Sequence, residues 1–111
     1  MRLTSAFWVA AFVRRCYGEG APAVVMRKGA EEAGAIFVVV DRLDGSNDLY
    51  GPAPQTEFSE AMPSDRLFQR VVEGQDAEAI TAAIARETRF DPDIWVVAVE
   101  DREARSFLDL I

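Results

Sequence analysis

Histidine is absent from this sequence, and cysteine occurs once, as Cys16, among 111 residues. Zinc and haem sites are built mostly from these two residue types, and Ser-His-Asp and Cys-His enzymes need a histidine as their base. We therefore expect no cofactor and no complete catalytic motif. Cys16 cannot close an intramolecular disulfide, and its apolar neighbourhood is typical of a small core residue in a reducing compartment.

Long hydrophobic runs are also missing. The longest run near the N-terminus, residues 3–13, holds about eleven residues, whereas a membrane-spanning helix needs roughly 20. Arg14 and Arg15 follow this run directly, which is unlike the region before the cleavage site of a secretory signal. We therefore predict a soluble cytoplasmic protein without a membrane partner.

Positive charge is scarce, because 12 Lys and Arg residues face 19 Asp and Glu residues, for a net charge of -7. A negative chain is repelled by the phosphates of DNA and RNA, which argues against a nucleic-acid partner. The charge is unevenly distributed: residues 1–42 carry six basic and four acidic side chains, and residues 43–111 carry six and fifteen. Such asymmetry can orient two subunits or a protein partner.

Half of the residues are hydrophobic, an ordinary globular balance, and the length suits one domain over residues 1–111. Hydrophobic periodicity and capping residues predict two helices, over residues 4–17 and 76–88. Apolar, β-branched runs bounded by turn residues predict strands at residues 23–27, 35–42, 48–51, 67–72 and 94–100.

This order predicts an α+β fold, with two helices packed on a mostly antiparallel sheet of four or five strands. The connections between the first strands have hairpin length, so we expect these strands to form an antiparallel meander. Only the last strand is reached through a helix and is therefore able to pair in parallel. The runs at residues 35–42 and 94–100 are apolar on both faces, and the first of these is expected to be central in the sheet.

The first predicted helix is apolar on both sides at 100° per residue. One side carries Val9 and Val13 and suits the core. We predict that the other side is a protein contact face, because aromatic and arginine side chains are typical of binding hot spots. A loop of the same domain covering part of it is the alternative. The predicted face consists of Phe7, Trp8, Ala11, Arg14 and Arg15.

Residues 41–48, DRLDGSND, resemble the Mg²⁺-binding motif of the inositol-monophosphatase and fructose-bisphosphatase families. The resemblance implies a small Mg²⁺- or Mn²⁺-dependent hydrolase that uses Asp41 and Asp44, with Glu31 or Glu32 as the upstream acid. Arg42 stands where that motif has proline, however, and an Asp-Gly pair after an apolar run is a strong hairpin-turn signal. We therefore interpret the segment as a turn.

Other charged residues carry two weaker predictions. Glu87 falls on the apolar side of the second helix, and a buried carboxylate needs a partner, so we predict a structural ion pair with a nearby arginine. Arg27, Arg42 and Arg89 are the candidate partners. Arg27, Lys28 and Arg42 are candidates for holding a small anionic ligand.

The two ends of the chain carry a more extensive similarity. The similarity covers residues 2–9 (RLTSAFWV) with Arg14 and Arg15 near the N-terminus, and residues 89–97 (RFDPDIWVV) with residues 100–102 (EDR) near the C-terminus. It also covers the hairpin at residues 42–45. These segments resemble a domain-of-unknown-function family of short alphaproteobacterial proteins, family 1491. The resemblance implies a compact bacterial cytosolic domain and supplies no activity, cofactor or catalytic residue. Our leading hypothesis is therefore a non-enzymatic interaction domain, either homodimeric or bound to an unidentified protein.

Overall fold

The computed structural model describes residues 3–54 and 66–111, which form two helices and five strands. Each element lies where local sequence patterns predict it, with bounds that differ by three residues or fewer. The elements are α1 (Ser5–Gly18), β1 (Ala23–Arg27), β2 (Ile36–Asp41), β3 (Asn47–Pro52), β4 (Phe68–Gln75), α2 (Ala77–Phe90) and β5 (Trp95–Glu100).

The strands form one mixed, mostly antiparallel sheet in the order β1-β5-β2-β3-β4. The predictions of an α+β fold, of a central β2 and of parallel pairing by the last strand are confirmed, because β5 lies parallel to β2. The predicted meander is confirmed only for β2, β3 and β4. The expected pairing of β1 with β2 is wrong: β5 lies between them and pairs antiparallel with β1.

The physical reason for this insertion is the two-faced apolar character of β5. Five of its six residues are buried or half-buried, so the strand needs cover on both faces and neighbours on both edges. A position between β1 and β2 supplies both neighbours. It leaves β1 at one edge of the sheet and β4 at the other.

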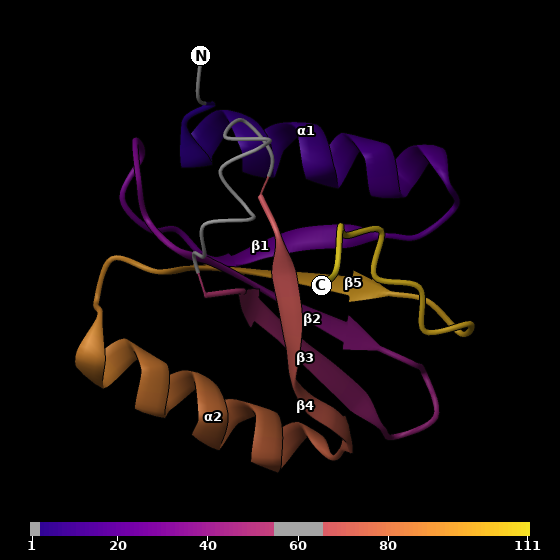
Figure 1. Cartoon of the computed structure of the whole chain (residues 1–111). Coiled ribbons are helices and arrows are strands. Elements are labelled where there is room, and N and C mark those ends of the chain that lie inside the picture. Colours follow the sequence, from indigo (N-terminus) through magenta and orange to yellow (C-terminus); the bar gives the residue numbers. More distant parts are fainter. Residues whose placement is uncertain (1–2, 55–65) are drawn as a thin grey trace.

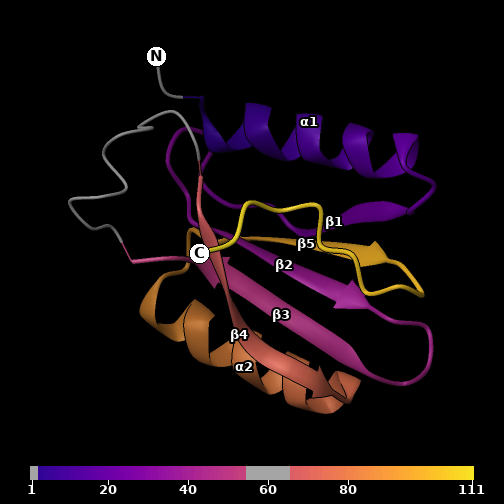
Figure 2. The same cartoon turned by 45° about the vertical axis from the view of Figure 1, so that its right-hand side comes forward.

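Figures 1 and 2 show the layers: α1 lies over one face of the sheet and α2 over the other. The segment after β5, residues 101–111, returns across the face that α1 covers. Two core clusters result. One joins α1 to the sheet through Val9, Phe12 and Cys16, and the other joins α2 to it through Ile80 and Ala83. No helix of the described ranges is long and apolar enough to cross a membrane.

The N-terminus of α1 is held by its own cap and by the loop that follows β1. The Thr4 hydroxyl accepts a hydrogen bond from Phe7 N at 3.1 Å, as expected for a capping threonine. The backbone N–H groups of Ser5 and Ala6 donate to carbonyl oxygens of the loop at residues 31–32, and the Ser5 hydroxyl donates to Gly34 O at 2.6 Å. The loop therefore satisfies donors that a helix start leaves unpaired.

Candidate functional site

The outer face of α1 carries four of the five residues predicted to form a contact face. Phe7 is 61% exposed, and Ala11, Arg14 and Arg15 are exposed as well. The opposite face of the helix is buried in the core, as its periodicity predicts. An exposed phenylalanine beside two guanidinium groups has the composition of a protein-binding surface.

Trp8 is placed differently from the other four. It is half-buried and stacks on Phe12, with 4.9 Å between ring centroids, and it contacts Phe68 of β4 in a tilted arrangement at 5.4 Å. At about 100° from Phe7 around the helix, its large ring reaches the sheet from the flank. Trp8 therefore supports the core beneath the contact face and is not freely available to a partner.

A second exposed apolar surface, which the sequence reasoning missed, lies along β1. Val24 is 60% exposed, Val25 39% and Met26 62%, and Tyr17 at the end of α1 is 59% exposed. A groove of about 290 Å³ runs beside Tyr17 and Val24, and its lining also includes Glu100. Pro22, directly before β1, is the sequence signal that could have identified β1 as an edge strand, since proline is common at the start of edge strands.

Residues 42–46 of the DRLDGSND segment form the turn between β2 and β3, as the Asp-Gly signal predicts, whereas Asn47 and Asp48 belong to β3. Asp41 Oδ1 accepts a hydrogen bond from Leu43 N at 2.8 Å, and Asp44 Oδ1 accepts from the Ser46 hydroxyl at 2.6 Å and from Ser46 N at 2.9 Å. These bonds from Ser46 lower the pKa of Asp44. The turn thus uses both of its first two carboxylates to order its own backbone.

The acids of the hydrolase hypothesis are not brought together. Asp41 and Asp44 lie at the end of β2, whereas Glu31 and Glu32 lie before its start. A six-residue strand separates the two groups by roughly 20 Å at about 3.3 Å per residue. Within the described part of the chain, no cluster of three or more His, Cys, Asp or Glu residues could hold a metal ion.

The three cations of the anionic-ligand hypothesis are also separated. Arg27 and Lys28 lie at the end of β1, beside the start of β5, and Arg42 lies at the far end of β2. Arg27 donates to Pro92 O at 2.7 Å, and Lys28 pairs with Glu31 at 3.6 Å on the surface. They do not converge on one ligand.

The predicted ion pair of Glu87 does not form among the residues that the structure describes. Glu87 is half-buried rather than buried, so its carboxylate keeps part of its hydration. Two of the arginines considered as partners are engaged elsewhere: Arg27 with Pro92 O, and Arg42 with Asp48. The geometric reason is that Arg42 lies next to Asp48 across the β2–β3 turn.

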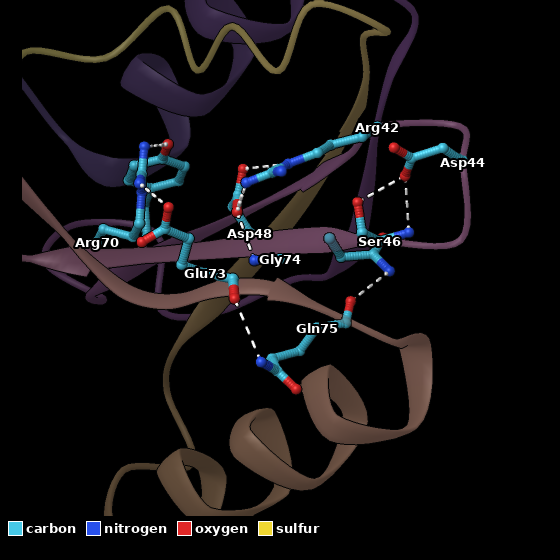
Figure 3. Close-up of polar contacts among 10 residues, drawn as sticks. Arg42, Asp44, Ser46, Asp48, Arg70, Glu73, Gly74 and Gln75 are labelled. Atoms are coloured by element: carbon cyan, nitrogen blue, oxygen red, sulfur yellow. Dashed lines mark hydrogen bonds and ion pairs between the residues drawn. The ribbon is translucent and has the colours of Figure 1, made fainter.

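Asp48 is instead a charged residue that the fold buries completely (Figure 3). Its side chain has no exposed surface, and it binds the Arg42 guanidinium in a bidentate arrangement, with Nε to Oδ2 at 3.0 Å and Nη2 to Oδ1 at 2.5 Å. The backbone N–H of Gly74 donates to Oδ1 at 2.8 Å. Gly74 has a φ of 62° at an irregularity in the β3–β4 pairing, a conformation that favours glycine.

The hydrogen bonds to Asp48 raise the pKa of the Arg42 guanidinium, as expected for a cation held by a carboxylate. Sequence reasoning missed this pair because it considered Arg42 only as a partner of Glu87 or of an anionic ligand. The sequence signal for the pair is that Arg42 and Asp48 are oppositely charged and lie on opposite sides of a hairpin turn, where their side chains share one face of the sheet.

A second carboxylate, Asp101, anchors the segment after β5. It is 7% exposed and accepts hydrogen bonds from Arg105 through Nη2 at 2.8 Å, Nε at 3.0 Å and the backbone N–H at 2.7 Å. These hydrogen bonds from Arg105 outweigh the effect of burial and lower the pKa of Asp101. The Arg105 guanidinium also lies 4.9 Å from the centre of the Phe107 ring.

This pKa shift predicts a pH dependence. Because the pKa of Asp101 is lower in the folded than in the unfolded chain, its contribution is complete above about pH 4, the unfolded value, and is lost as the pH falls through the folded pKa. We expect Asp101→Asn to destabilise the protein at pH 7 and to flatten the loss of stability below pH 4. Urea unfolding of both proteins at pH 7, 5, 4 and 3 tests this, and parallel curves would contradict it.

The fold and the exposed surfaces define a small α+β domain. Its mixed sheet lies between two helices, and apolar side chains are exposed to solvent on α1 and β1. A family model described as a protein of unknown function (DUF1491) matches residues 3–109, and the chain belongs to this family. The resemblance inferred from the terminal segments is thereby confirmed.

Solved structures of related proteins are similar to this chain over its full length. The solution structure of protein Atu0922 from A. tumefaciens is 44% identical, with a TM-score of 0.87 and 96% of its own length covered. A crystal structure and an NMR structure of a DUF1491 family protein from Caulobacter crescentus are each 38% identical, with TM-scores of 0.80 and 0.79 and with 99% and 98% of their lengths covered. A search of curated proteins gave no match to the chain.

Proposed function

We propose that the chain is a single, non-enzymatic, cytoplasmic interaction domain that associates with a second copy of itself through a surface that includes the outer face of α1. The observation that carries this proposal is the exposure of Phe7, at 61%, on a helix whose position is otherwise fixed. Ser5 anchors α1 to the loop after β1, and Trp8 anchors it to the sheet, so its outer face is held rigidly.

The energetics of this face favour protein contact. Full burial of a phenylalanine side chain stabilises a complex by roughly 1.5–3 kcal/mol before the costs of association. Ala10 and Ala11 beside it are small and exposed, so a partner can approach the helix backbone closely. Arg14 and Arg15 add exposed guanidinium groups, which pair well with the carboxylates of a chain of net charge -7.

Light scattering over a concentration series tests the proposal. We expect the unmodified chain to reach the mass of a dimer in the micromolar range, and Phe7→Asp to shift it toward a monomer while its circular dichroism is unchanged. Phe90→Asp is the matched control: Phe90 is 85% exposed, but it lies at the end of α2, on the other face of the sheet.

If Phe90→Asp weakened association as much as Phe7→Asp, general surface hydrophobicity would explain the result and α1 would not be the contact face. A monomer up to high micromolar concentration would exclude self-association altogether.

A further inference from the structure

The two edges of the sheet differ in how well they are protected. β4 carries Arg70 and Glu73, contains two irregularities in its pairing with β3, and is bridged at Phe68 to Leu110 of the C-terminal segment. Charge, irregular pairing and cover by another segment are devices that keep an edge strand from pairing with other chains. The regular part of β1, residues 23–25, carries no charge, and in the described sheet it pairs only with β5.

We infer that the second copy joins along β1, so that two β1 strands pair antiparallel about a two-fold axis and the two sheets become continuous. This inference rests on the proposed self-association and names its geometry. A two-fold axis at Val25 sets Val24 of one copy opposite Met26 of the other, and Ala23 opposite Arg27. The exposed apolar side chains of β1 then cover one another, and its unpaired edge N–H and C=O groups find partners.

Charge complementarity supports this orientation. Glu100 N donates to Pro22 O at 2.9 Å, which places Glu100 beside the start of β1, and Asp41 is the neighbour of Glu100 across the β2–β5 pairing. The antiparallel arrangement brings Arg27 and Lys28 of the second copy to this acidic end, and the two-fold axis repeats the contact. Lys28 is free to reorient, because its ion pair with Glu31 is on the surface, with side chains 68% and 72% exposed.

The groove beside Val24 fits the same geometry. Its wall includes Tyr17, Val24 and Ala98, and it has a volume of about 290 Å³. Met26 of the second copy lies opposite Val24, and an unbranched thioether side chain adapts well to an irregular apolar groove. A register irregularity between Val25 and Arg27 leaves Met26 62% exposed in one copy, so it is available to the other.

Helix α1 supplies a second layer of contact. It packs over β1, the edge strand, so pairing of the two β1 strands brings α1 and its counterpart side by side on one face of the joined sheet. Trp8 faces Phe68 on the β4 side, so the opposite flank of α1 faces the outer edge of β1. That flank carries small and apolar residues at helical spacing: Ala6, Ala10, Val13 and Tyr17.

Val24→Lys tests the pairing, because it sets a charge opposite Met26 twice in each dimer. Val24 is 60% exposed, so the fold tolerates the change. We expect the dimer dissociation constant to rise about 100-fold or more. The matched control is Val71→Lys on β4, the other edge strand, where the valine is 44% exposed and no change in mass is expected.

Charge reversal tests the orientation. Lys28→Glu and Glu100→Lys are each expected to weaken the dimer about tenfold, and the double variant to recover most of the affinity. Hydrogen exchange provides a direct measurement: the outward N–H groups of residues 23–25 should become protected at high protein concentration and lose that protection on dilution.

The outcomes separate this inference from the broader proposal. A dimer that Phe7→Asp disrupts but Val24→Lys leaves intact, without concentration-dependent protection of β1, overturns the β1 geometry and keeps the contact face on α1. A dimer that only Val24→Lys disrupts supports the β1 geometry and removes α1 as the main contact. A monomer at every concentration overturns both.

Discussion

Asp48→Ala is expected to lower the free energy of unfolding by about 3 kcal/mol. The variant removes the carboxylate that accepts both Arg42 hydrogen bonds and the one from Gly74 N, inside a site with no exposed surface on Asp48. Gly74 N is then left without its acceptor. Because small domains are stable by only about 5–15 kcal/mol, the expected drop in melting temperature is large, roughly 15 °C.

Urea unfolding measures this loss as a shift in midpoint with an unchanged m-value. Glu31→Ala is the control, since it removes one member of an ion pair whose side chains are 68% and 72% exposed, and exposed pairs contribute about 0–1 kcal/mol. A second variant, Arg42→Met with Asp48→Ala, should lose less than the sum of the single changes, because the two residues interact. A loss below about 1 kcal/mol for Asp48→Ala would show that the buried pair contributes little beyond its solvation cost.

Gly29→Ala is expected to be the most disruptive single-methyl change, costing about 3 kcal/mol or more. A β-carbon at Gly29 would overlap the carbonyl oxygen of Asp93 and lie 2.6 Å from the carbonyl carbon of Ile94. Both are backbone atoms directly before β5, so neither can rotate aside. Gly34 is similarly restricted, with Asp93 O at 2.5 Å from the position of its β-carbon.

The opposite result is expected for Gly18→Ala at the end of α1. No atom lies within 4 Å of the added methyl, and alanine reduces the flexibility of the unfolded chain, which stabilises the fold by about 0.5–1 kcal/mol. Thermal unfolding of the two variants side by side provides the comparison. Equal melting temperatures would show that the loop at residues 28–34 moves away from β5 at little cost.

The loop at residues 28–34 links this stability to the proposed contact surface. It accepts the hydrogen bond from Trp95 Nε1 at Ala30 O, at 2.8 Å, and it holds the first turn of α1 through Ser5. A loosened loop would therefore release α1 as well as β5. Gly29→Ala should weaken self-association together with folding, whereas Asp48→Ala, which lies beside Val40 near the opposite end of β2, should affect folding alone.

The sequence by itself determined the helices and strands of this protein, because their signals are local. Thr4 caps its helix as the sequence predicts, and Asp44-Gly45 makes the turn after β2, while Asp76, which was expected in the first turn of its helix, is the cap of that helix. The apolar β-branched run of β2 likewise placed that strand in the interior of the sheet, and the run of β5 showed that both of its faces need cover. The absence of histidine also restricts the chemistry that the side chains can perform near neutral pH.

Only the tertiary structure decided which elements meet. Insertion of β5 beside β1 depends on a crossover through α2, and this crossover made β1 an edge strand with an exposed apolar surface. The same long-range packing turned Trp8 into a support for the core against Phe68. Formation of the β2–β3 hairpin paired Arg42 with Asp48, its neighbour across the turn, rather than with Glu87. The physical reason is that hydrophobic periodicity indicates which face of each helix or strand must be buried. The element that buries each face is determined by contacts between residues that are distant in the chain.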